Sequence, residues 1–111
     1  MAQAIEKSKW AAYCELISKA VQGGQAEIEV ASLDLGNQVE AEWLPLIGIS
    51  YDPKDDIIDI ALDGVDHIIH QPRELRADGE FAELSALEIT DKDGIQHLVR
   101  LKGSLALPSP H

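Results

Sequence analysis

Hydrophobic and polar residues follow two different periods along this chain. Near the N-terminus, apolar residues recur at helical spacing, while Glu15 and Lys19 form a favourable i,i+4 pair on the opposite side. The apolar stripe consists of Trp10, Tyr13, Cys14, Ile17 and Val21. This pattern predicts one amphipathic helix with Ser8 as its N-cap. Gly23-Gly24 is the predicted stop, because glycine readily takes the left-handed conformation that ends helices.

After the two glycines the period changes from 3.6 to 2, which is typical of strands with one buried face. Segments rich in alternating or β-branched residues are separated by turn sequences such as Asp63-Gly64 and Asp78-Gly79. Pro72 is predicted to bound the strand that precedes it. The predicted strands cover residues 26–30, 39–43, 46–51, 57–62, 67–70, 84–90 and 95–102, with a weaker one at 74–76.

The connections between these strands are too short for the crossovers of a parallel sheet, so the sheet must be mainly antiparallel. The sequence therefore predicts an α+β fold, in which the N-terminal helix packs on a six- or seven-stranded meander. Two forms of this sheet fit the pattern, an open two-layer arrangement and a sheet rolled into a partial barrel. We expect a single domain over residues 1–104 and an extended, proline-containing tail over residues 105–111.

The sign of the charge narrows the range of partners. The chain has 111 residues and a formal net charge of −11, and residues 34–66 hold nine carboxylates against one cation, Lys54. The nine are Asp34, Glu40, Glu42, Asp52, Asp55, Asp56, Asp59, Asp63 and Asp66. Because they alternate with apolar residues, they indicate solvated faces and turns of a sheet and not a disordered acidic tail.

This acidity argues against nucleic acids and anionic membranes as partners, since both are bound mainly through Lys and Arg. No apolar run approaches the roughly 20 residues that cross a bilayer. The N-terminus also lacks the basic and apolar regions of a signal peptide. We therefore expect a cytoplasmic protein that binds neither nucleic acid nor membrane.

The sequence contains no recognisable machinery for nucleophilic catalysis or cofactor binding. Cys14, the only cysteine, lies within the apolar stripe, so we expect a buried, unreactive thiol. Gly-x-Ser-x-Gly elbows, phosphate-binding glycine loops and dinucleotide fingerprints are missing from the chain. We expect no cofactor.

Asp66, His67 and His70 form the one place where carboxylate and imidazole groups crowd together. On a strand, His67 and His70 point to opposite faces, while Asp66 and His70 share a face at a separation of about 13 Å. These residues cannot form a metal site by themselves. A site requires His97 or another carboxylate from a neighbouring strand. We expect instead that an aspartate or a backbone group holds the histidine.

The aspartate-rich turns do not predict a metal site either. Asp91-Lys92-Asp93-Gly94 fails as a calcium-binding EF-hand loop, because placing Gly94 sixth puts Ile89 first, and we interpret it as a hairpin turn. Asp52, Asp55 and Asp56 surround Pro53 and are interpreted as solvated, turn-forming residues.

Trp43 and Tyr51 flank the apolar segment 44–49, which fits either a core strand or an interface. Aromatic residues are enriched at the centres of interfaces, yet a chain with five aromatic residues also needs them in its core. Both residues are therefore candidate partner contacts, beside their expected role in the core.

The chain also resembles a family of small bacterial proteins that share a domain of unknown function. The similarity covers nearly the whole chain, including the N-terminal helix with its tryptophan. It is carried by Trp43-Leu44-Pro45-Leu46, Gly48-Ile49, Tyr51-Asp52-Pro53-Lys54, Asp56, Asp66-His67, Ile69, Pro72, Asp91 and Asp93-Gly94. The resemblance implies a bacterial, cytoplasmic, single-domain protein, and it implies no functional residues.

Two classes of function remain. The first is a non-enzymatic interaction module whose acidic surface meets a basic protein partner, or whose sheet edge pairs with a second copy. The second is a small enzyme or ligand-binding protein that uses the region of Asp66 and His67. A concave site with His67 and a second titratable partner would favour the second class.

Overall fold

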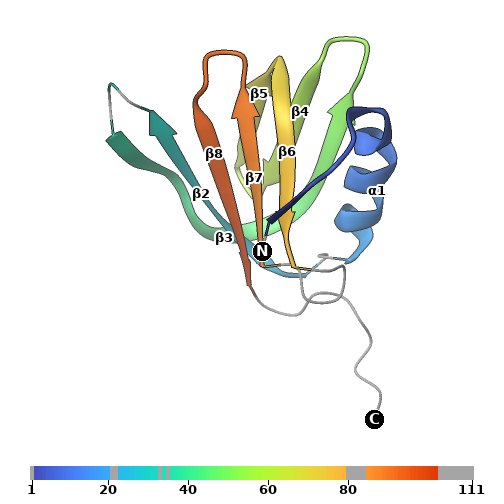
Figure 1. The fold of residues 1–111 in the computed structure, drawn as a ribbon. Coiled ribbons are helices and arrows are strands. Elements are labelled where there is room, and N and C mark those ends of the chain that lie inside the picture. The colour runs from blue at the N-terminus through green and yellow to red at the C-terminus, as the bar shows by residue number, and fades with distance from the viewer. Residues whose placement is uncertain (1, 21–22, 33, 35, 80–84, 103–111) are drawn as a thin grey trace.

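The computed structural model describes residues 2–20, 23–32, 34, 36–79 and 85–102. In this part of the chain, one α-helix packs on an eight-stranded antiparallel sheet (Figure 1), which confirms the α+β class. The predicted count of six or seven strands is wrong, because a short N-terminal strand joins the sheet and the weak 74–76 segment is a full strand. The elements are β1 (Ala2–Ala4), the 3-10 helix η1 (Lys7–Lys9), α1 (Trp10–Ala20), β2 (Gln25–Ser32), β3 (Gly36–Asp52), β4 (Ile57–Leu62), β5 (Val65–His70), β6 (Pro72–Asp78), β7 (Ala86–Asp91) and β8 (Gln96–Lys102).

The strands follow the order β1-β6-β7-β8-β2-β3-β4-β5. Two meanders, β2 to β5 and β6 to β8, are joined by the pairing of β8 with β2, so the chain does not form one continuous meander. Gln71 separates the two meanders, and its positive φ of 49° turns the chain out of the β4–β5 hairpin. The sheet is not closed, and β1 and β5 form its two edges.

The long strand β3 connects two layers of the fold. One layer consists of β1, β6, β7, β8, β2 and the first part of β3, and the other consists of the second part of β3, β4 and β5. Residues 39–43 and 46–51, predicted as separate strands, belong to this one element, which leaves β2 near Pro45 and pairs with β4 from Leu46 onward. Trp43 has a positive φ of 48° at the bend, and the carbonyl of Pro45 accepts a hydrogen bond from the N–H of Asp63. In Figure 1, β3 runs along the base of the molecule from β2 to the helix side.

Helix α1 lies along the hydrogen-bonding edge of β3 beyond Pro45, where β2 no longer pairs with it. Ser18 makes two hydrogen bonds there: its hydroxyl donates to the carbonyl of Ile49 at 2.6 Å and accepts from the N–H of Ile49 at 2.7 Å. The apolar side of the helix is buried through Trp10, Cys14 and Ile17, as its periodicity predicts. These contacts dock the helix against a strand that would otherwise present unpaired backbone groups.

The start of the helix differs from the prediction. Ser8 lies inside η1, whose N-cap is Glu6, and no side chain caps this end. The indole N–H of Trp10 instead donates to the carbonyl of Ile5 at 2.8 Å. At the other end, Gly23 has a φ of 86°, in agreement with its predicted role as a helix stop.

The core lies between the two layers of strands and the helix. It consists of Trp10, Cys14, Ile17, Ala26, Ile28, Ala41, Leu46, Ile49, Ile58, Ile60, Leu62, Ile69, Leu75, Ala77, Leu87, Ile89, Val99 and Leu101. The predicted tail at residues 105–111 lies outside the described residues. In the described ranges, no helix is long and apolar enough to cross a membrane.

Candidate functional site

A chain of three hydrogen-bonded side chains links the two layers of the sheet. His67 on β5 pairs with the buried Ile60 of β4, and its Nε2 atom lies 2.9 Å from Nδ1 of His97 on β8. The Nε2 atom of His97 lies 2.9 Å from Oδ2 of Asp91 at the end of β7. Three strands thus contribute one side chain each, and we call the set Asp91–His97–His67 the histidine chain.

Strand alternation places two members of this chain in the interior. His97 is on the same side of β8 as the buried Val99 and lies opposite Ile89 of β7. Asp91 is the last residue of β7, and it lies on the buried side of that strand. Asp91 and His97 are only 9% and 8% exposed, so their polar groups need partners inside the protein.

Hydrogen bonds fix the charge of Asp91. Its Oδ1 atom accepts from the backbone N–H groups of Asp93 at 2.9 Å and Ile95 at 3.1 Å, as a turn-forming aspartate does. Burial would raise the pKa of Asp91, but the hydrogen bonds from His97 and from these two N–H groups outweigh burial and lower it. Asp91 is therefore an ionised acceptor, and both of its oxygens are in use.

With Asp91 ionised and both imidazole rings neutral, one set of hydrogen-bond directions fits the histidine chain. Because Asp91 can only accept, the Nε2 atom of His97 carries the proton, and in the neutral ring Nδ1 is then an acceptor. That acceptor receives the Nε2 proton of His67. The Nδ1 atom of His67 keeps its lone pair and is the accepting end of the histidine chain.

The surroundings of His67 favour its neutral form. Burial lowers the pKa of His67, His97 lowers it further, and the carboxylate of Glu40 opposes both effects. A neutral His67 can accept a hydrogen bond or a proton at Nδ1. The histidine chain therefore contains a base and two groups that orient it, and its three members include no Ser, Thr, Cys or Lys side chain that the base could activate.

The predicted cluster around His67 is divided between two faces. Asp66 and His70 are exposed on the opposite side of β5 from His67, so neither joins the histidine chain. His97 does reach His67, but it comes from β8, which is not a strand neighbour of β5. Sequence reasoning missed Asp91, which it assigned only to a turn. Within the described ranges, no three His, Cys, Asp or Glu side chains are grouped so that they could hold a metal ion.

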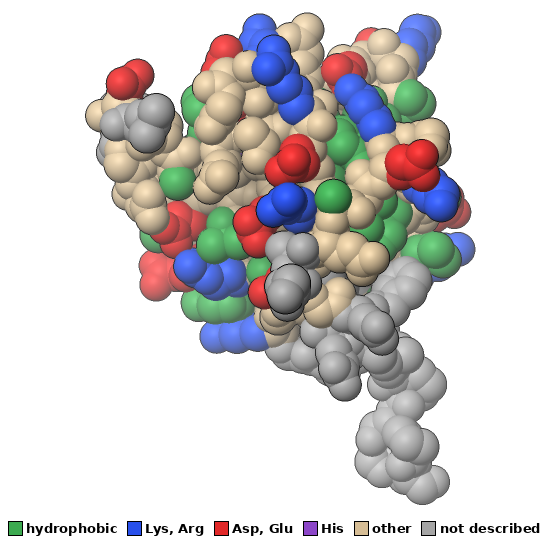
Figure 2. All heavy atoms as spheres, in the orientation of Figure 1, with side chains coloured by type: hydrophobic (Ala, Val, Ile, Leu, Met, Phe, Trp, Pro, Cys, Tyr) green, Lys and Arg blue, Asp and Glu red, His purple; other side chains and the backbone are tan. Residues whose placement is uncertain are grey.

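A second feature is a depression of about 610 Å³ on the outer side of β2, β3, β7 and β8, which we call the outer groove. Its position follows from alternation, since Glu29, Leu98 and Arg100 point away from the buried side of their strands. The groove is lined by Glu29, Ala31, Asn37, Trp43, Asp78, Ser85, Ala86, Glu88, Gln96, His97, Leu98, Arg100 and Leu101. Figure 2 shows acidic, basic and apolar side chains next to one another at the left of this view.

Arg100 organises one wall of the outer groove. Its Nη1 atom lies 2.7 Å from Oε1 of Glu27 and 2.9 Å from Oε1 of Glu29. Glu29 also accepts a hydrogen bond from the amide nitrogen of Asn37 at 2.6 Å. The bond from Arg100, followed by that from Asn37, lowers the pKa of Glu29. The groove therefore has charged walls held in fixed positions.

Trp43 provides the aromatic part of the outer groove. The Nζ atom of Lys102 lies 4.1 Å from the centroid of its ring, which is a cation–π contact. The ring is half-buried, at the bend of β3. Trp43 therefore lines a concave surface and already interacts with a cation through one face.

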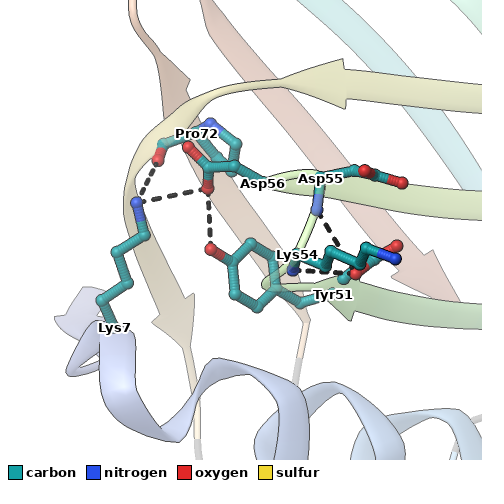
Figure 3. A network of polar contacts seen from close by, with 7 residues as sticks. Lys7, Tyr51, Lys54, Asp55, Asp56 and Pro72 are labelled. Carbon is teal, nitrogen blue, oxygen red and sulfur yellow. Dashed lines mark hydrogen bonds and ion pairs between the residues drawn. The ribbon is translucent and has the colours of Figure 1, made fainter.

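Tyr51, the other aromatic candidate, belongs to a structural network (Figure 3). Its hydroxyl donates to Oδ1 of Asp56 at 2.7 Å, and Nζ of Lys7 lies 3.2 Å from the same oxygen. Lys7 also donates to the carbonyl of Pro72, and the ring of Trp10 meets Tyr51 edge to face at 5.2 Å between centroids. Burial, followed by the hydrogen bond to Asp56, raises the pKa of Tyr51 to about 12. This network joins the start of the helix to the β3–β4 turn.

Asp52 forms this turn, as predicted, whereas Asp56 is half-buried and paired with Tyr51 and Lys7 and is not a solvated residue. Oδ1 of Asp52 accepts from the N–H groups of Lys54 at 2.9 Å and Asp55 at 3.5 Å. Asp56 has a positive φ of 54° and accepts from the N–H of Gln71 through its carbonyl. The turn stabilises itself with these groups.

Cys14 is 1% exposed, and burial raises the pKa of its thiol to about 12. The prediction of a buried cysteine is confirmed. A thiol of this kind holds almost no thiolate near neutral pH, so it is not a nucleophile.

Comparison with known proteins supplies a family and no activity. The model of a family of unknown function, DUF5335, matches residues 1–110. An uncharacterised protein from Aquifex aeolicus (strain VF5) is 36% identical over 107 residues, which cover 96% of each chain. No solved structure shows significant similarity to the chain. The chain belongs to the DUF5335 family, as its resemblance implies, and its function is unknown.

Proposed function

We propose that this member of the DUF5335 family is a non-enzymatic interaction module that binds a basic segment of a protein partner in the outer groove. One observation carries the proposal: three carboxylates, Glu29, Asp78 and Glu88, share the groove with the indole of Trp43 and one guanidinium. Carboxylates and an aromatic face are the groups that recognise Lys and Arg side chains.

The charge of the whole protein supports the same kind of partner. The formal net charge is −11, and seven of the nine carboxylates in residues 34–66 are exposed. The other two are Asp56, which pairs with Lys7, and Asp59, which is half-buried. A field of one sign increases the rate of encounter with a basic partner and disfavours nucleic acid and anionic lipid. We propose a bacterial cytoplasm as the place of action.

A basic peptide tests this proposal directly. We expect a lysine–arginine oligopeptide to bind wild type, with an affinity that falls as salt is added, because salt screens charges outside a contact core. Glu88→Gln should weaken binding by about threefold to tenfold, in line with about 1 kcal/mol for one charge pair. Asp55→Asn is the matched control, since it removes one exposed carboxylate outside the groove.

Calorimetric titration at low and high salt distinguishes the outcomes. Equal losses in E88Q and D55N would mean that net charge, and not the outer groove, recognises the peptide. Failure of the peptide to bind wild type at low salt would contradict the proposal. A mixed-sequence RNA of similar charge density serves as the negative ligand.

A second candidate function, a small enzyme or ligand-binding protein, is favoured by the histidine chain. Its Nδ1 acceptor on His67 is oriented by Asp91 through His97, which is how a general base is usually held. If wild type converted a metabolite and a folded His67→Gln variant did not, the enzyme function would be favoured over the interaction module. A ligand that shifts the NMR resonances of the His67 ring would do the same for binding.

A further inference from the structure

Strand β5 forms one edge of the sheet. In the described part of the chain, β4 is its one strand neighbour. Ile68, at its centre, is 44% exposed. Edge strands are usually protected by lysine, proline or a bulge, because their free N–H and C=O groups attract other strands. The segment Val65–His70 contains neither lysine nor proline, and its pairing with β4 is regular.

The pairing with β4 determines which backbone groups of β5 are free. The N–H of Gln71 bonds to the carbonyl of Asp56 on the β4 side. In an antiparallel pair, the residues that bond to one neighbour alternate with residues that face the other way. The backbone groups of Asp66, Ile68 and His70 therefore point away from β4, and their side chains lie together on the outer face.

We propose that a second copy of this chain pairs with β5 in antiparallel orientation, about a twofold axis at Ile68. In this register Ile68 lies opposite Ile68 of the other copy, so two half-exposed apolar side chains cover each other. Asp66 lies opposite His70 at both ends, where an imidazole N–H can donate to a carboxylate. A twofold interface needs one self-complementary surface, and the outward side chains of Asp66, Ile68 and His70 provide it.

Neighbouring registers lack this complementarity. The free backbone groups allow only shifts that keep Asp66, Ile68 and His70 facing one another. One such shift places Asp66 opposite Asp66, which is unfavourable because like charges repel. Another places Asp66 opposite Ile68, which leaves the carboxylate beside an apolar group. The register centred on Ile68 is the one that matches all three outer side chains.

The charges near the edge agree with this pairing. Asp66 raises the pKa of the half-buried Asp59 on β4, after the larger effect of burial, so the two carboxylates repel each other. His70 of a second copy, opposite Asp66, would reduce this repulsion. Each copy carries a formal net charge of −11, so the two copies also repel at long range. Added salt should therefore strengthen self-association, whereas it weakens the binding of a basic partner.

Sedimentation velocity on the full chain, from micromolar to millimolar concentration, tests the proposal. We expect the 12.1 kDa chain to double its mass with concentration, more readily at high salt. Ile68→Lys should weaken dimerisation by about tenfold or more. Ile47→Lys is the matched control, because Ile47 is 61% exposed on β3, and it should leave the dimer unchanged.

An exchange of the paired residues tests the register itself. His70→Asp places carboxylates opposite each other and should weaken the dimer by about tenfold. The double variant D66H/H70D restores opposite pairs at both ends and should recover the wild-type affinity. Circular dichroism checks that each variant is folded.

A monomer at every concentration and salt level would overturn the proposal, and so would a dimer that resists both I68K and H70D. The outer groove is independent of these results, because I68K and I47K should bind the basic oligopeptide equally. If wild type formed the β5 dimer but did not bind the basic oligopeptide, the proposed function would be wrong and the dimer proposal would stand.

Discussion

The bond between helix and sheet at Ser18 gives a sharp test of how the fold is stabilised. Its hydroxyl satisfies both backbone groups of Ile49, with distances of 2.6 and 2.7 Å, at the place where β3 has lost its neighbour β2. Ile49 is 3% exposed. Ser18→Ala removes one oxygen and leaves a buried donor and a buried acceptor without their partner.

The expected loss of stability follows from those two groups. A buried polar group left unsatisfied costs about 1–3 kcal/mol, which sets a range of about 2–6 kcal/mol for the pair. Alanine favours helix over serine by about 0.5 kcal/mol, and the half-exposed position lets water reach part of the site. We therefore expect S18A to lower the free energy of unfolding by about 2–4 kcal/mol. In a chain of this size, that corresponds to a fall in Tm of about 8–16 °C.

Thermal and urea unfolding, followed by circular dichroism, measure this effect. Ser50→Ala is the control, because Ser50 is exposed on the same strand and most exposed substitutions change stability by no more than about 0.5 kcal/mol. If S18A melted within a degree or two of wild type and S50A, the hydroxyl would not be what docks α1 on β3. A change in the urea m value would show instead that the variant alters the native or denatured state more broadly.

Three further predictions concern the core, pH and metal. Trp10→Ala should cost about 3–5 kcal/mol in the same unfolding assay, because the ring is 1% exposed; an unchanged midpoint would show an undocked helix. The lowered pKa of His67 means that the unfolded chain binds protons more readily, so stability should fall as pH drops below about 6.5. It should fall again when Asp91 is protonated at more acidic pH. His67→Gln should flatten the first of these losses, and a pH profile identical to that of wild type would contradict this assignment. Chelator treatment should leave the melting curve unchanged, and a large fall would indicate a metal needed for folding.

The helix and most strands could be predicted because their patterns are local. Trp10, Cys14 and Ile17 recur at the helical period within eight positions, and the structure buries all three. The alternation in residues 57–62 likewise reports the buried side of β4 directly. Such patterns depend on neighbours in sequence, so they need no knowledge of how the layers stack.

The elements that were missed depend on distant partners. Strand β1 has three residues, too few for a visible period, and it exists through pairing of Ala2–Ala4 with β6. The weak 74–76 segment is the middle of β6, which is stabilised by a neighbour on each side. Strand β3 appeared to end before Pro45, yet the N–H of Leu46 bonds to the carbonyl of Gly24 and the chain continues. Tertiary hydrogen bonds override local signals in each case.

Only part of the histidine chain could be predicted from the sequence. Asp91 and His97 face the same side of one hairpin, so their contact could be deduced from alternation once the turn between them is known. The contact of His97 with His67 could not be deduced from the sequence, because the two residues are 30 positions apart and belong to different layers. Strand β3 passes from one layer to the other where it changes partner near Pro45. The bend of β3 contributes no atom to the histidine chain, yet a substitution that straightens β3 should separate the two imidazoles without altering either residue.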